Sequence, residues 1–195
     1  MNGKFRTPRH LRGIPHFVGF GALRKGFGLW LLLVSFRVFS GETFTLAPGL
    51  TVNLPDALPV QVAELQSSNE SPVLMGYVEG APAYFLSATR IPQWQRTNLA
   101  WTKLDLALSD SSDDGHIQIK TNGRFKTRLD VEVWYRAYEF SNGGDIQRPV
   151  YFLLKGHYQL YWLTLTVAEG VNTEVVLPMA EVLVRRMEIE AVRHP

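Results

Sequence analysis

The stretch VYFLLKGHYQLYWLTLT, residues 150–166, contains the strongest indication of the fold. Two apolar segments of strand length, Val150–Leu154 and Tyr158–Val167, flank the tight connection Lys155-Gly156-His157. Consecutive strands joined by so short a connection pair antiparallel, because a parallel pair needs a long crossover. The stretch therefore predicts a β-hairpin within an antiparallel sheet.

The residues before this hairpin are also predicted to form strands. Ile117–Thr121 and Arg124–Arg128 flank Asn122-Gly123, a dipeptide typical of two-residue hairpin turns because both residues tolerate a positive φ. Leu129–Phe140 fits one long strand, and Ser141–Asp145 fits the turn that follows it. We therefore expect the antiparallel sheet to continue through this region.

Strand patterns also occupy the segment that begins at residue 43. Thr43–Ala47 and Leu50–Leu54 place apolar side chains at alternate positions, which is the period of a strand with one buried face. Val73–Glu79 and Ala83–Arg90 are separated by glycine and proline and predict a further hairpin. Val60–Leu65 fits either a strand or a short helix, and the pattern leaves both open.

Two segments, Asn98–Leu108 and Glu174–Met187, have helical spacing instead. The apolar residues that recur at three and four positions are Trp101, Leu104 and Leu108 in the first segment and Val175, Met179, Val182 and Leu183 in the second. Asn98 is expected to cap the first helix, with Lys103 and Asp105 pointing away from its apolar stripe. Helices that bury such stripes against an antiparallel sheet define an α+β layer architecture.

Residues 1–40 have the features of an export signal. Arg24-Lys25 precede the apolar run Phe27–Phe36, and a basic region followed by 7–15 apolar residues is typical of secretory signals. The run is shorter than the ~20 residues that span a bilayer as a helix. We expect cleavage after Ser40, which leaves residues 41–195 as a single domain without a stable membrane span.

Two features of this leader depart from the usual pattern. Arg37 lies close to the expected cut site, and the basic region is unusually long. Translation that starts near residue 23 would leave a compact signal. An uncleaved signal anchor in the inner membrane and a buried N-terminal helix are the alternatives to a periplasmic or secreted protein.

Charge is distributed unevenly along the chain. The net charge is +2, but residues 1–40 contain seven basic residues and no acidic one, so the other 13 basic residues face all 18 acidic ones after residue 40. The resulting charge of −5 gives the domain no broad attraction to nucleic acid or to an anionic membrane. The chain has no cysteine, which excludes disulfides, thiolate chemistry and lipid attachment at a cysteine.

These elements together resemble the PsbP-like superfamily, whose bacterial members include exported DcrB-type proteins of the envelope. The resemblance rests on the residue 150–166 stretch with its Leu160-Tyr161-x-Leu163-Thr164 strand, on Val182-Leu183-Val184 in the closing helix, and on the opening segment Phe44–Pro55. It implies an α/β/α sandwich in which helices cover an antiparallel sheet. It also implies a binding or assembly role without a shared catalytic motif.

One loop has part of a calcium-binding pattern. Asp110, Ser112 and Asp114 place oxygen atoms at positions 1, 3 and 5, and a glycine follows at position 6. Position 12 is Thr121 instead of a bidentate acid, so a solvated helix-to-strand turn is the favoured interpretation. His116 and His157 lack partners at spacings typical of metal or nucleophile sites, and we predict no cofactor.

A basic strand and an aromatic cluster are the candidate binding residues. Arg124, Lys126 and Arg128 alternate with other residues, which places three cations on one face of one strand; they fit an anionic or acidic partner, or an edge protected against aggregation. The aromatic candidates are Trp134, Tyr138, Tyr161 and Trp162. Alternation sends Trp134 and Tyr138 to one face of the sheet and Tyr135 to the other, so core packing competes with recognition.

The sequence therefore favours an exported, non-enzymatic binding or assembly-accessory protein whose partner is another, unidentified envelope protein. A periplasmic small-ligand-binding protein is the second hypothesis. The third is a hydrolase with an unrecognised site.

Overall fold

The computed structural model describes residues 36–37, 43–54, 59–63, 72–91, 96–156 and 159–190. The chain divides into two compact units, Met1–Leu33 and Val34–Pro195, and the described residues all belong to the second unit. Most of the predicted leader, including its cleavage site after Ser40, lies outside the described residues, as do His157 and Tyr158.

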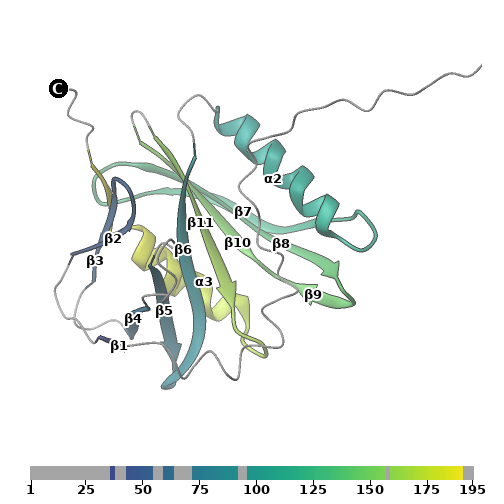
Figure 1. Cartoon of the computed structure of the whole chain (residues 1–195), viewed down its shortest axis with the longest axis horizontal. Helices are drawn as coiled ribbons and strands as arrows, with labels where there is room; N and C mark the ends of the chain where they lie inside the picture. Colours follow the sequence, from purple (N-terminus) through teal and green to yellow (C-terminus); the bar gives the residue numbers. More distant parts are fainter. Residues whose placement is uncertain are drawn as a thin grey trace, which may run out of the picture. The chain divides into compact units, whose positions relative to one another are not determined.

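The main sheet contains nine strands within the described part of the chain, all paired antiparallel (Figure 1). Their order across the sheet is β1 (Phe36–Arg37), β4 (Val60–Ala63), β5 (Val73–Val78), β6 (Ala81–Ile91), β11 (Leu160–Val167), β10 (Val150–Lys155), β8 (Glu132–Asn142) and β7 (Gln118–Lys126), with β9 (Asp145–Gln147) paired to the end of β8. The hairpin predicted from residues 150–166 is therefore at the centre of the sheet. The undecided segment at Val60 forms a strand.

A second, smaller sheet joins the two ends of the described region. It consists of β12 (Met187–Ile189), β3 (Leu50–Asn53) and β2 (Thr43–Ala47), in that order. Because β12 follows the last helix directly, pairing of Met187 with Val52 ties that helix to the first strands of the domain.

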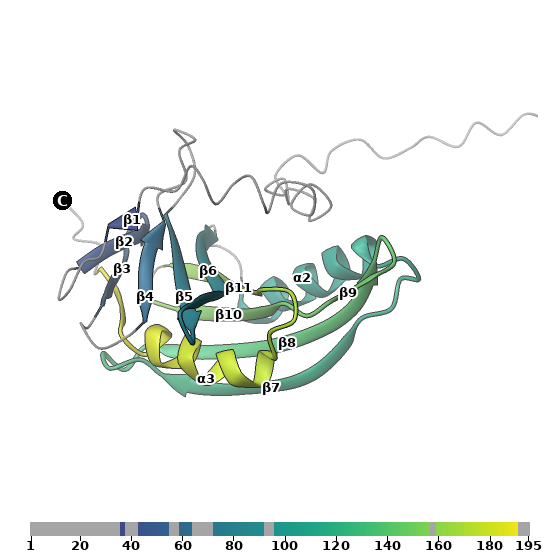
Figure 2. The ribbon, with the colours of Figure 1, turned by 90° about the horizontal axis from the view of Figure 1, so that it is seen from below.

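Two helices cover opposite faces of the main sheet, which confirms the α+β architecture. Side chains alternate along β8, so that Val133 packs in the cluster that contains α3 (Thr173–Val184), whereas Tyr138 packs in the cluster that contains α2 (Thr97–Ser111). Tyr135 lies on the α3 side and Trp134 on the α2 side, as predicted. Figure 2 shows α2 above the long strands β8 and β10 and α3 below β10.

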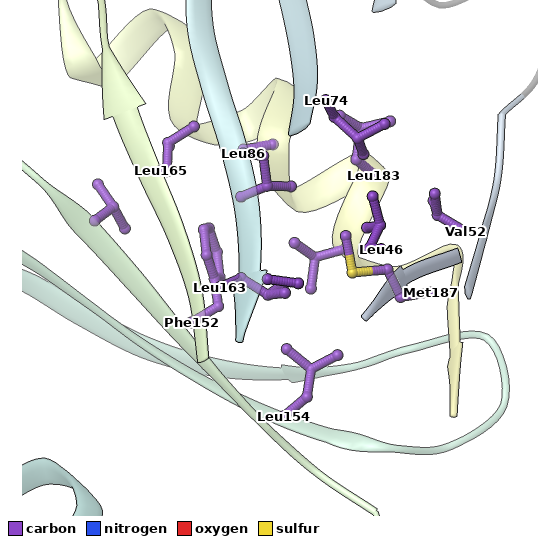
Figure 3. Close-up of a cluster of buried hydrophobic side chains, with 14 of the residues drawn as sticks. Leu46, Val52, Leu74, Leu86, Phe152, Leu154, Leu163, Leu165, Leu183 and Met187 are labelled. Carbon is purple, nitrogen blue, oxygen red and sulfur yellow. The ribbon is translucent and has the colours of Figure 1, made fainter. Parts of the chain in front are cut away.

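The larger core lies between the main sheet, α3 and the small sheet (Figure 3). Leu86, Leu163 and Phe152 contribute from the main sheet, Leu183 from α3 and Leu46 from β2, and all five side chains are fully buried. Full burial of such a side chain contributes roughly 1.5–3 kcal/mol, so this cluster supplies a large part of the stability. The smaller core holds Trp101, Leu104 and Leu108 of α2, which confirms the predicted stripe.

The predicted hairpin turn at Asn122-Gly123 is wrong. β7 runs straight through both residues, and Gly123 pairs with Tyr135 of β8. A Cβ atom on Gly123 would lie 2.6 Å from Cε1 of Tyr135, so this glycine makes room for a neighbouring ring. The chain reverses instead between Thr127 and Val131, where Asp130 has a φ of 62°.

Both helices differ from their predicted details. Asn98 lies inside α2, whose N-cap is Arg96 without a side-chain cap, and Asp105 points to the sheet. The residues of α3 that the core buries are Val176, Ala180, Leu183 and Val184, whereas the predicted stripe members Val175 and Val182 are 51% and 40% exposed. Apolar residues occupy more than one face of this helix, so its spacing did not identify the buried face.

Loss of the hydroxyl group is expected to affect stability differently at two buried tyrosines, Tyr151 and Tyr161. The Tyr151 hydroxyl has no hydrogen-bonding partner among the described residues, and burial raises its pKa. We expect Tyr151→Phe to leave the free energy of unfolding unchanged or to raise it by up to about 1 kcal/mol, because an unsatisfied buried donor is removed. The ring contacts with Tyr138 and Trp162 are retained in phenylalanine.

Tyr161→Phe is the matched control. In the unmodified chain the Tyr161 hydroxyl donates to the Pro48 carbonyl oxygen at 2.8 Å and contacts Gln159 Oε1, which ties β11 to the turn between β2 and β3. Removal of this donor is expected to lower stability by about 1–2 kcal/mol. Urea denaturation of both variants measures the difference, and equal losses in the two would contradict it.

Candidate functional site: a cationic pocket at the end of α3

An open pocket of about 390 Å³ lies where the end of α3 meets the turn between β7 and β8. Four of its six lining side chains are basic. The residues that line it are Lys126, Thr127, Arg128, Val182, Arg185 and Arg186. We call this group of residues the cationic pocket.

Backbone contacts hold the two sides of the cationic pocket together. The Arg128 amide donates to the Arg185 carbonyl oxygen at 2.8 Å, and Arg185 Nη1 donates to the Lys126 carbonyl oxygen at 3.2 Å. The guanidinium of Arg185 also stacks 4.3 Å from the ring centroid of Phe125. The turn after β7 is therefore fastened to the C-terminal end of α3, which brings the four cations to one pocket.

The carboxylates near the cationic pocket neutralise only part of its charge. Lys126 Nζ donates to Asp130 at 2.7 Å, and this hydrogen bond raises the pKa of Lys126. Arg185 lies 3.9 Å from Glu181, a distance typical of a weak exposed pair. Within the described residues, neither Arg128 nor Arg186 forms an ion pair with a carboxylate.

Arg186 carries a further sign of an incomplete site. Its Nε atom is buried and has no hydrogen-bonding partner among the described residues. A buried charged donor without an acceptor is unfavourable by several kcal/mol in an apolar setting and by about 1–3 kcal/mol in typical proteins. An anionic group in the cationic pocket would place an acceptor near this arginine.

The structure brings together only part of the predicted basic strand. Lys126 and Arg128 line the cationic pocket, although Arg128 lies in the turn and not in β7 as predicted. Arg124 is not part of the lining; it lies on β7, the edge strand of the sheet, opposite Trp134. Sequence reasoning missed Arg185 and Arg186, for which the only signal was a pair of adjacent cations after an apolar helix.

The predicted aromatic surface is largely internal. Tyr138 and Tyr161 are fully buried, so core packing and not recognition explains these two residues. Trp162 is half-buried, and its ring centroid lies 4.6 Å from that of Trp101 in α2. Trp134 is also half-buried and packs against the same cluster. Tyr138, Trp134 and Trp162 pack against α2, whereas Tyr161 lies in the larger core on the other face of the sheet.

The acidic loop after α2 is organised as a turn. Asp114 Oδ1 accepts from the His116 amide at 2.9 Å and from the Ser112 hydroxyl at 2.8 Å. Asp113 accepts from the amides of Gly143 and Gly144 and from Ser141, and these hydrogen bonds lower its pKa. Among the described residues, no three acidic or histidine side chains gather as a metal site; Asp110 joins no such group.

Helices cover both faces of the antiparallel sheet, which is the sandwich that the sequence resemblance implied. The solution structure of cyanobacterial PsbP (CyanoP) from Synechocystis sp. PCC 6803 matches with a TM-score of 0.51 at 10% identity, covering 79% of this chain and 95% of that one. The crystal structure of LpqN, involved in cell envelope biogenesis of Mycobacterium tuberculosis, matches with a TM-score of 0.50 at 11% identity, covering 82% and 92%.

These two similarities establish that this chain has the PsbP-like fold. No protein-family model matches the sequence, and no curated protein matches it. None of the helices in the described residues is long and apolar enough to cross a membrane.

Proposed function

We propose that this chain is an exported, non-enzymatic binding or assembly-accessory protein of the bacterial envelope, and that it holds an anionic group of its partner in the cationic pocket. The observation that carries this proposal is that two arginines, Arg128 and Arg186, have no carboxylate partner among the described residues, in a pocket whose two sides are joined by hydrogen bonds. Charged groups of this kind bind carboxylates and phosphates through strong, charge-assisted hydrogen bonds.

Location and class have separate support. The basic, apolar residues 1–40 support export, and LpqN, which shares the fold, is a protein of cell envelope biogenesis. The rest of the domain carries a net negative charge, so a local cationic pocket selects a specific acidic group and does not attract anionic surfaces in general.

Crosslinking in cells tests this proposal. The full chain with a C-terminal tag is crosslinked in bacterial cells, and the partners that co-purify from the envelope fraction are identified by mass spectrometry. We expect one dominant envelope partner, and we expect the variant Lys126→Glu/Arg128→Glu to lose roughly tenfold or more of it, because a hydrogen bond to a charged group contributes about 1.5–3 kcal/mol and about 1.4 kcal/mol is a factor of ten in affinity. Both residues are exposed, so the fold is retained.

The matched control is Arg90→Glu/Arg96→Glu. These two exposed cations lie outside the cationic pocket, and their reversal changes the net charge by the same amount. Equal loss of the partner in both variants would show an effect of net charge alone and would refute the role of the pocket. Recovery of the tagged chain without any envelope partner would refute the assembly role.

Binding of a small anionic ligand is the second candidate, favoured by the volume of the cationic pocket. About 390 Å³ falls at the lower end of the range for small-molecule sites. Native mass spectrometry of the purified chain is expected to show an additional mass in this case, lost in Lys126→Glu/Arg128→Glu and kept in Arg90→Glu/Arg96→Glu.

A further inference from the structure

The face of α3 that points away from the sheet is apolar. Val175 and Val182 are 51% and 40% exposed; between them lie the exposed Pro178 and Met179, which is partly buried against the larger core. The spacing of three, four and seven residues places these four on one side of the helix. We call them the outer stripe of α3. A helix that is apolar on both sides is usually buried on both, and here one side lacks a cover within the described residues.

The outer stripe is symmetric about its own centre. The midpoint lies between Pro178 and Met179, with Val175 and Val182 at equal distances on either side. If two such helices pack antiparallel, Val175 of each faces Val182 of the other, and Pro178 faces Met179. This arrangement has the two-fold symmetry of the commonest protein dimers, in which the same patch covers itself.

Charges beside the outer stripe are arranged in the same complementary way. Glu174 and Arg185 lie at opposite ends of α3 and, eleven residues apart, on the same flank of the helix. In the antiparallel pair, Glu174 of each copy lies about 3 Å along the helix axis from the point opposite Arg185 of the other, since each residue rises 1.5 Å. Arg185 remains 44% exposed beside its contacts with Lys126 and Phe125, so the two opposite charges can attract each other twice, once at each end.

We infer that a second copy of this chain covers the outer stripe, so that the protein forms a two-fold symmetric dimer through antiparallel α3 helices. Val182 belongs to both the outer stripe and the cationic pocket, so the second copy lies at the rim of each pocket. An anionic membrane surface fits less well, because it would meet Glu174 and Glu181 along the helix and cations only at the Val182 end of the stripe. Val182 and Arg185 are shared by the dimer contact and the cationic pocket, so variants of Lys126 and Arg128, which lie outside the outer stripe, separate the two.

The absence of cysteine from the chain allows a direct test of this contact. In the double variant Val175→Cys/Val182→Cys, the two cysteines of one helix are about 10 Å apart along the axis and cannot bond to each other, because disulfides need Cα atoms within about 7 Å. They meet across the antiparallel pair. Oxidation of the full chain at roughly 100 µM is expected to produce a covalent dimer on a non-reducing gel, since interfaces of this small size bind weakly.

Single variants test the orientation. Met179→Cys lies close to the two-fold axis and is expected to crosslink, whereas Val175→Cys alone is expected to give at least fivefold less dimer. Equal crosslinking of both single variants would show a parallel or random contact and would overturn the proposal. So would the absence of dimer in the double variant.

Sedimentation equilibrium of the cysteine-free chain provides a second measurement. We expect Val182→Glu to weaken dimerisation roughly tenfold or more, because it places a charge against an apolar side chain. Leu106→Glu is the control, because Leu106 is a 60% exposed leucine on the outer side of α2. A monomer at all concentrations, or equal effects of the two variants, would contradict the inference. The Lys126→Glu/Arg128→Glu variant should still dimerise, which separates this result from that of the crosslinking to an envelope partner.

Discussion

Gly76→Ala is expected to lower the free energy of unfolding by about 3 kcal/mol or more, since overpacking of a rigid core typically costs about 1–3 kcal/mol and occasionally more. Gly76 lies in β5 directly opposite Tyr84 of β6, and a Cβ atom at this position would overlap Cζ and Cε1 of the Tyr84 ring. Tyr84 is fully buried in the larger core, so the ring has no space into which to move. Urea denaturation measures the loss.

Gly123→Ala is the matched comparison. A Cβ atom there also meets a tyrosine ring, that of Tyr135, but β7 is an edge strand and Tyr135 is only half-buried. The ring can move toward solvent, so we expect Gly123→Ala to lower the free energy of unfolding by only about 1 kcal/mol or less. Equal losses at Gly76 and Gly123 would contradict this explanation.

A double-mutant cycle assigns the effect at Gly76 to the ring. In a Tyr84→Leu background the overlapping ring atoms are absent, so Gly76→Ala is expected to lose much less stability there than in the unmodified chain. The coupling energy between two residues in contact is commonly about 0.5–3 kcal/mol. Additive effects would show that the backbone, and not the Tyr84 ring, requires glycine.

Asp105→Ala is expected to lower stability by about 2–3 kcal/mol, the second largest effect. Asp105 of α2 accepts from Arg136 Nη1 at 2.9 Å and from the Tyr138 hydroxyl at 2.6 Å, both on β8. Arg136 also stacks over Trp101 at 4.4 Å. Removal of the carboxylate leaves a charged donor and a buried hydroxyl without their acceptor, and α2 loses its polar attachment to the sheet.

The size of this effect is limited by solvent. The side chains of Arg136 and Asp105 are 28% and 34% exposed. The loss of stability is therefore smaller than the roughly 3–5 kcal/mol expected when a fully buried ion pair is broken. Glu181→Ala is the control, because its 3.9 Å pair with Arg185 is too long for a hydrogen bond, and we expect a loss of less than about 0.5 kcal/mol. Equal effects of Asp105→Ala and Glu181→Ala would refute the proposed attachment.

The local patterns of the sequence were sufficient for most elements. The two-residue turn at Glu79-Gly80, with φ of 51° and 81°, forms where glycine and proline separate two apolar segments. The alternation of Trp134 and Tyr135 correctly predicted a sheet covered on both faces. These features depend on the period of side chains along one element, which neighbouring residues alone determine.

The sequence was not sufficient where a segment fits more than one local structure. The dipeptide Asn122-Gly123 favours a turn, but the Tyr135 ring packs on Gly123 and both residues of the dipeptide lie within β7. α3 is apolar on more than one face, so only its packing against the sheet decides that Val176 and not Val175 is buried.

Two of the four cations of the pocket, Lys126 and Arg128, were identified as basic neighbours from the alternation of residues along the chain. Arg185 and Arg186 join them from nearly sixty residues further along the chain, because the turn after β7 is hydrogen-bonded to the end of α3. The sequence by itself therefore determined the fold class, most of the strands and the alternation of three cations from Arg124 to Arg128, which it placed on one strand. Only the tertiary structure decided which distant residues share the site, because register and contact between elements depend on the packing of the whole core.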